Sequence, residues 1–227
     1  ATAMRYFWEE EHGSHFEGLF DPTLDSVAPQ GPMLRLAREV AQVGVDARST
    51  LEESDYQAFP HHPSALAHLD KILEGAWKDA QEGRFIYLTS KSKPKLKGVI
   101  SVPLGFVPKS LPDRTVSRTE GREVVDPKPQ NDNVVKELFH PALMPKHREL
   151  ARTILWWSQR YPGFLILLAK KDIADAFKWL WPMAECAGLF STSFLKGQAS
   201  LTQDIILIWL VLNFGWRGGP GCFVQAS

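Results

Sequence analysis

The sequence predicts an α+β domain in which a mixed sheet packs against helices. Stretches with apolar residues at helical spacing and short runs rich in β-branched and aromatic residues alternate in the order helix, strands, helix, strand, helix. Apolar residues make up 44% of the 227 residues, which is enough to build a core. The 16 prolines favour a loop-rich chain over a helical bundle.

An acidic, loop-rich segment is predicted at the N-terminus. Residues 1–57 contain 11 acidic and four basic residues, a net charge of about −7. A helix is expected from Pro32 to Gly44, and residues 45–63 predict a polar linker that ends in FPHHP. We therefore divide the chain into residues 1–62, whose role the sequence does not indicate, and a folded domain over 63–227.

The clearest helix is predicted over residues 64–83. Ser64 is a suitable N-cap, and Gly83 is a suitable stop. One face carries Leu66, Leu69, Leu73 and Trp77, with Ile72 and Ala76 beside them. After this helix, RFIYLTS and KGVISVPLGFVPK predict short strands, and residues 108–133 predict a long loop or hairpin tip.

A second helix is predicted over residues 145–163. Pro145 stands at its start, Pro162 and Gly163 end it, and its apolar face carries Leu150, Ile154 and Trp157. The apolar run FLILLAK then predicts a buried strand over residues 164–170.

The last third of the chain predicts a short helical turn from Asp175 and a loop over residues 188–200. The run IILIWLVL at 205–212 predicts a buried helix or strand, and GWRGGPG at 215–221 predicts a turn.

The composition excludes several classes of protein. Two cysteines, Cys186 and Cys222, are too few for a disulfide framework and lack zinc-ligand spacing. We therefore expect an intracellular, not a secreted, protein. The first residues are acidic, unlike a signal peptide, and the longest apolar run is too short to span a membrane. Because the chain does not begin with Met, we expect it to be processed or part of a longer protein.

The stretch KKDIADAF at 170–177 is a candidate metal and phosphate site. Asp172 follows the predicted strand, and a carboxylate there suits Mg²⁺, which takes one or two carboxylates plus substrate phosphates. Asp175 suits the cap of a turn whose N–H groups bind phosphate, and Phe177 would form a flat wall. An ordinary strand that ends in solvent and a capped helix would use the same residues.

The stretch FGWRGGPG at 214–221 is a second candidate. Its glycines permit positive φ angles and the close approach of a ligand, while Trp216 offers a stacking face and Arg217 a charge. A plain Gly/Pro turn with a packed tryptophan is the alternative.

Basic residues gather in residues 86–122, whose net charge is about +6. Lys109 and Arg114 lie on the predicted hairpin, where they could close over a triphosphate. KSKPKLK has lysines at a period of two, so in an extended strand they would face one way and follow a phosphate backbone: Lys91, Lys93, Lys95 and Lys97. A solvated charged face is the alternative.

In this order, the stretches resemble the fingers and palm of retroelement reverse transcriptases. LDKILEGAWKDAQEGRFIYL resembles the helix and strand that open that domain, and ISVPLGFVPK with RTV resembles its fingers pattern. KKDIADAFKWLWP is similar to polymerase motif A, and FGWRGGPGCF is similar to motif B. The resemblance covers residues 66–225.

The resemblance implies fingers and a partial palm of an RNA-directed DNA polymerase, a nucleotidyltransferase that uses magnesium. Asp172 would be the catalytic, Mg²⁺-binding carboxylate, and Phe177 would reject a ribose 2′-OH. The nucleotide-binding residues would be Lys109, Arg114, Asp175, Ala176, Phe177, Gly215, Trp216, Arg217, Gly218 and Pro220. The implied partners are a primer–template nucleic acid and a dNTP.

Two departures from the family pattern limit the expected activity. Phe214 stands where a polar Gln is frequent in part of the family. No Asp-Asp pair of the kind found in motif C occurs in the sequence, although two-metal phosphoryl transfer needs a second carboxylate near the first. We therefore expect a fragment or degenerate copy of a polymerase that is inactive by itself.

Two other interpretations remain open. The chain is alternatively a polymerase-derived, non-catalytic binding or structural module of a larger complex, whose acidic N-terminal segment would contact a protein partner. It is otherwise an unrelated α+β domain that matches the motifs by chance.

Overall fold

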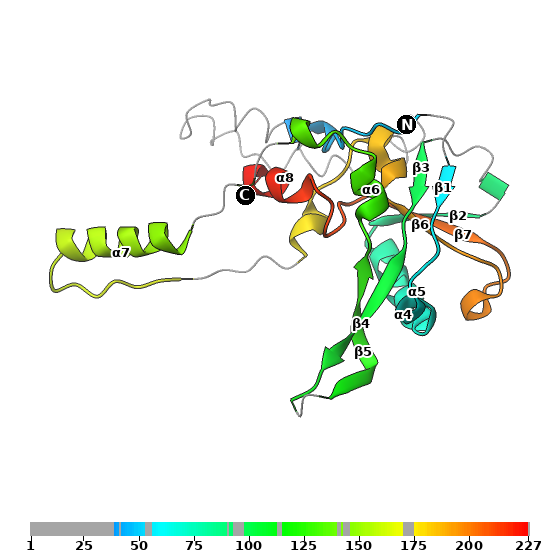
Figure 1. Cartoon of the computed structure of the whole chain (residues 1–227), viewed down its shortest axis with the longest axis horizontal. Coiled ribbons are helices and arrows are strands. Elements are labelled where there is room, and N and C mark those ends of the chain that lie inside the picture. Colours follow the sequence, from blue (N-terminus) through cyan, green and yellow to red (C-terminus); the bar gives the residue numbers. More distant parts are fainter. Residues whose placement is uncertain are drawn as a thin grey trace.

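The chain folds as α+β, as the sequence predicts, with a mixed five-stranded sheet, a two-stranded hairpin and packed helices among the described residues (Figure 1). The computed structural model describes residues 39–40, 42–52, 56–89, 91–92, 98–112, 115–139, 142, 146–169 and 175–226.

The five-stranded sheet has the order β1-β3-β6-β7-β2. Its strands are β1 (Tyr56–Ala58), β3 (Val99–Ser101), β6 (Ser191–Phe194), β7 (Ile205–Trp209) and β2 (Phe85–Thr89). β1 and β6 pair parallel to β3, whereas β7 pairs antiparallel to β6 and β2. Residues 206–209 of β7 are buried, as in a strand covered on both faces. Of the two alternatives for the apolar run at 205–212, the strand is therefore the one formed.

Two helices replace the single helix expected over residues 64–83. These are α4 (Pro63–Leu66) and α5 (Leu69–Gln81), and Gly83 ends the second with a φ of +70°. The core face of α5 consists of Leu69, Ile72 and Ala76. The expected face was wrong at two positions, because Leu66 and Trp77 are exposed.

The break between α4 and α5 follows from contacts with the hairpin. The His68 ring stacks on Phe106 with ring centroids 4.3 Å apart. Ser64 Oγ accepts a hydrogen bond from the N–H of Phe106 at 3.1 Å. Ser64 makes no cap hydrogen bond and instead ties the helix to the hairpin.

The hairpin pairs β4 (Leu104–Ser110) with β5 (Val116–Val125) in antiparallel register. The expected hairpin is present, but most of the expected loop over 108–133 is strand or helix. The short helices α6 (Lys128–Asp132) and η2 (Lys136–Leu138) follow β5. A Cβ atom at Gly121 would lie only 2.4 Å from the Phe106 ring, so this strand requires glycine there.

A linker was expected over residues 45–63, but the described residues 45–52 and 56–58 include buried positions and strand β1. Val45 and Ala47 are buried, and the N–H of Val45 donates to the carbonyl of Trp181 at 2.6 Å. The expected loop over residues 188–200 was also wrong in part, since it contains β6 and the short helix η5 (Gln198–Ser200). A further short helix, η4 (Ala184–Leu189), precedes β6.

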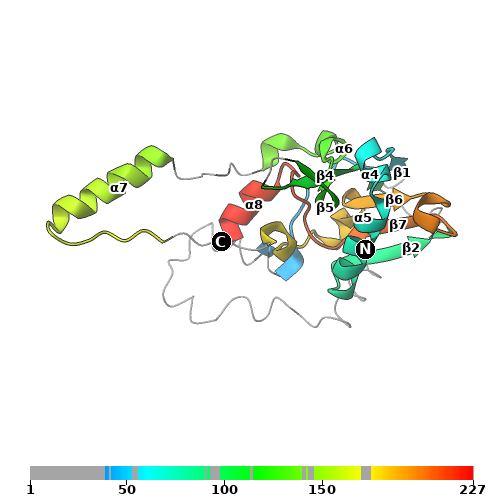
Figure 2. The same cartoon turned by 90° about the horizontal axis from the view of Figure 1, so that it is seen from below.

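Helix α7 (His147–Arg160) forms as predicted, but none of its residues is buried. It lies apart from the sheet in both views (Figures 1 and 2). Its expected first residue, Pro145, lies outside the described residues. Residues 164–169 do not form the expected buried strand, and Phe164, Leu165 and Leu167 are more than three-quarters exposed. No described strand pairs with them, so their backbone groups have no sheet to join.

The C-terminal part of the described chain ends in α8 (Gly219–Ala226), which packs against the short helix η3 (Ala176–Trp179). Among the described helices, none combines the length and apolar character needed to cross a bilayer.

Candidate functional site

The structure brings together the two stretches that resemble motifs A and B. Phe177, on η3, meets Phe214 edge to face, with ring centroids 5.6 Å apart. A Cβ atom at Gly219 would lie 3.1 Å from the Phe177 ring. Phe177 therefore packs closely on the first residue of α8, and a side chain at position 219 would displace it.

The turn before α8 is held by Asn131, a residue that the sequence did not single out. Its side-chain oxygen accepts a hydrogen bond from the N–H of Arg217 at 2.7 Å, and its side-chain nitrogen donates to the carbonyl of Gly215 at 3.3 Å. The Arg217 guanidinium donates to the Asn131 carbonyl at 3.2 Å. Gly215 has a φ of +92°, a conformation that favours glycine.

Trp216 is buried, and its ring meets Phe139 and Phe190 edge to face at 5.2 and 5.3 Å. A Cβ atom at Gly218 would lie 2.3 Å from the Trp216 ring. In the described structure the tryptophan thus packs inside the core, which is the alternative that the sequence left open, and Gly218 provides the space for it. Pro220, in α8, is exposed.

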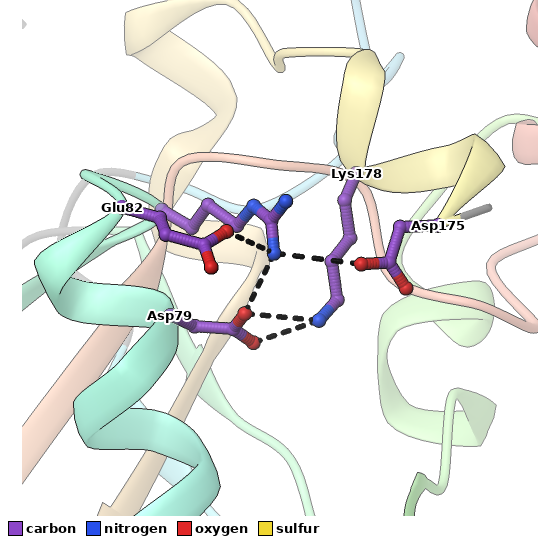
Figure 3. A network of polar contacts seen from close by, with 5 residues as sticks. Asp79, Glu82, Asp175 and Lys178 are labelled. Carbon is purple, nitrogen blue, oxygen red and sulfur yellow. Dashed lines mark hydrogen bonds and ion pairs between the residues drawn. The ribbon is translucent and has the colours of Figure 1, made fainter.

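A network of charged side chains lies beside η3 (Figure 3). Lys178 Nζ donates to both carboxylate oxygens of Asp79, at 2.9 and 3.0 Å, and Arg84 Nη1 donates to the same carboxylate at 2.9 Å. Arg84 also pairs with Glu82 at 2.7 Å and with Asp175 at 3.5 Å. The network therefore joins α5, the start of β2 and η3.

Asp175 precedes η3 but does not cap it through its side chain, contrary to expectation. Its backbone has a φ of +54°, which is uncommon for a residue other than glycine. The carboxylate instead faces Arg84, and the Asp175 carbonyl accepts the N–H of Lys178 at 2.7 Å.

Glu123, on β5, is partly buried. Burial and the negative charge of Asp79, opposed by Lys178, together raise the pKa of Glu123 to about 7. Burial and Asp79 also raise the pKa of Tyr87. The sequence pattern of this strand did not single out Glu123, because the charged residues that shift its pKa, Asp79 and Lys178, are distant from it in the sequence.

The other predicted site residues are divided between described and undescribed parts of the chain. Lys109 is exposed and pairs with Glu120 at 2.9 Å, which raises the pKa of Lys109. Lys91 is exposed, and Ala176 is partly buried on η3. The remaining predicted residues lie outside the described residues: Arg114, Lys93, Lys95, Lys97 and Asp172.

Nowhere in the described part of the chain do three or more His, Cys, Asp or Glu side chains gather in a way that could hold a metal ion. The carboxylate of Asp175, one of the expected residues, faces a guanidinium.

The chain was compared with known proteins. No family model matches it, and no curated protein matches it.

Proposed function

We propose that this chain is the fingers and partial palm of a reverse-transcriptase-like polymerase, and that the surface around Phe177 and Gly215–Pro220 is its deoxynucleotide site. The contact of Phe177 with Gly219 and Phe214 carries this proposal. Two stretches about 40 residues apart in sequence, each chosen for its resemblance to a polymerase motif, share one surface.

The chemistry of this surface suits a nucleotide. The aromatic ring of Phe177 offers a flat apolar wall for the sugar, and its bulk would exclude a ribose 2′-OH. Arg217 is exposed beside the turn and offers a charge to the phosphates. Lys109 is exposed as well. A phosphate could break its ion pair with Glu120 at little cost, since ion pairs on the surface contribute about 0–1 kcal/mol to stability.

Nucleotide binding, and not nucleotide transfer, is the function proposed for this chain. Mg²⁺, when bound, would neutralise phosphate charge. The resemblance assigns the ion to Asp172, which lies outside the described residues, and the sequence contains no Asp-Asp pair. We therefore propose that the chain alone binds a dNTP without adding it to a primer.

Isothermal titration with dNTPs and rNTPs tests this proposal. The wild-type chain should bind dNTPs more tightly than rNTPs, and Phe177→Val should lose most of this preference. Phe164→Val is a matched control, because Phe164 is an exposed aromatic residue outside the surface. Absence of dNTP binding would refute the site. Incorporation of dNTPs that Asp172→Ala abolishes would refute the proposal of binding alone.

A polymerase-derived binding module is the second candidate. One observation favours it: Asp175 and Lys109, two of the expected nucleotide residues, are engaged in ion pairs within the chain. Binding of single-stranded nucleic acid would be measured over a series of salt concentrations. The slope of log K against log salt should flatten when Lys91, Lys93, Lys95 and Lys97 are replaced together. Absence of binding at low salt would favour a protein partner.

A further inference from the structure

Asp79 connects parts of the chain that are far apart in sequence. It lies near the end of α5, and its carboxylate accepts hydrogen bonds from Lys178 of η3 and from Arg84 at the start of β2. We propose that Asp79 is a positioning residue for the candidate nucleotide site, and that it orients Phe177 by holding Lys178. The part about nucleotides rests on the proposed function.

The first step of the argument concerns η3, which is only four residues long. Short 3₁₀ turns have poor hydrogen-bond geometry and place successive side chains about 120° apart around their axis. Fixing the side chain of Lys178 therefore fixes the direction of the adjacent Phe177. Both carboxylate oxygens of Asp79 accept from Lys178, which makes this tether directional.

The second step concerns the rigidity of Asp79 itself. The N–H of Arg84 donates to the Asp79 carbonyl at 2.9 Å, and the Arg84 side chain returns to the carboxylate of the same residue. The Arg84 carbonyl accepts the N–H of Leu210, just after β7, at 2.9 Å. The side chains of Asp79 and Arg84 are each about one-fifth exposed, so water competes less for them than on the open surface.

The third step concerns the charge of the network. The five groups of the network carry a formal charge of −1: Asp79, Glu82, Asp175, Arg84 and Lys178. Arg84 pairs with Glu82 and Asp175 besides Asp79, so loss of the Asp79 charge acts chiefly on Lys178.

Fluorine NMR of the full chain, with 4-fluorophenylalanine placed at position 177, tests the positioning role directly. Asp79→Asn keeps the shape of the side chain but removes its charge, and should shift or broaden the signal. Glu82→Gln is the matched control, since it removes a carboxylate from Arg84 without touching Lys178, and should leave the signal in place. An unchanged signal in Asp79→Asn would overturn the proposal.

A second variant keeps the test decisive. If Asp79→Asn does not fold, Lys178→Met removes the same contact from the other side and must produce the same change.

Titration with dNTPs separates this inference from the proposed function. Asp79→Asn should raise the Kd for dNTP roughly fivefold to tenfold, because the aromatic wall is no longer fixed. If the wild type binds no dNTP but Asp79→Asn still moves the Phe177 signal, the positioning of η3 stands and the nucleotide function fails. If the wild type binds dNTP and Asp79→Asn changes neither signal nor Kd, the positioning role fails alone.

Discussion

The ammonium group of Lys178 lies 2.9 and 3.0 Å from the two carboxylate oxygens of Asp79, although the residues are 99 positions apart in the chain. This pair links the first long helix of the described fold to the turn that carries Phe177. It therefore connects the stability of the fold with the geometry of the candidate site.

The first prediction concerns the contribution of Asp79 to stability. Asp79→Asn should lower the free energy of unfolding by about 1–3 kcal/mol, because it removes the carboxylate that holds the partly buried Lys178 and one of the three carboxylates around Arg84. Urea unfolding followed by circular dichroism measures this change. Glu74→Gln on the same helix is the control. Glu74 also meets two lysines, but the pairs are exposed, so its midpoint should not move.

The second prediction concerns the pH dependence that Glu123 confers. Its pKa is raised from 4.5 to about 7 on folding, so the folded chain binds this proton more tightly than the unfolded chain does. The stabilisation is therefore complete below pH 4.5 and is lost as the pH rises through 7. Relative to that of the wild type, the free energy of unfolding of Glu123→Gln should rise by about 2–3 kcal/mol as the pH increases from 4.5 to 8.

Unfolding of both proteins in urea over this pH range checks the prediction, because other titrating groups cancel in the difference. Glu120→Gln is the control on the same strand. Glu120 is exposed, and Lys109 lowers its pKa, so its difference from the wild type should not rise with pH. A Glu123→Gln difference that stays flat with pH would show that folding does not raise the pKa of Glu123.

The third prediction contrasts two glycines. Gly218→Ala should destabilise the fold by about 1–3 kcal/mol, because the new methyl group would lie 2.3 Å from the buried Trp216 ring. Gly75, in the middle of α5, has open space around it. Gly75→Ala should therefore stabilise the fold by about 0.5–1 kcal/mol through helix propensity. Thermal unfolding of both variants tests the pair, and equal effects would contradict it.

Local patterns were sufficient to predict the strands β2 and β3 and a helix end near Gly83, but they left the run that forms β7 open between helix and strand. They were insufficient where a distant contact decides the outcome. The helix expected over 64–83 divides into two at the point where His68 stacks on Phe106. Strand β5 was not predicted, because the reason for its Gly121 is visible only in the fold, where a Cβ atom would meet the same Phe106 ring. Neither contact leaves a trace in the periodicity of either segment.

The candidate site shows the same limit. Motif similarity pointed to Phe177 and to the turn at 215–220, and these meet in the structure. It did not indicate Asp79, Glu123 or Asn131, since each acts through a partner at least 44 positions away in the chain. Charged residues on a helix or strand ordinarily predict a solvated face, and only the fold shows which of them converge.

The last prediction concerns residues 164–169, where an apolar segment is exposed. Leu165 and Leu167 are 84% and 81% exposed, so replacing both with Asp removes little buried surface. The double variant should unfold within about 0.5 kcal/mol of the wild type, as surface substitutions do. It should also associate less in light scattering, because exposed apolar patches promote association. Leu207→Asp is the control, since Leu207 is buried in β7, and it should unfold the chain. A loss of more than about 2 kcal/mol in the double variant would mean that the segment is packed against other residues in solution.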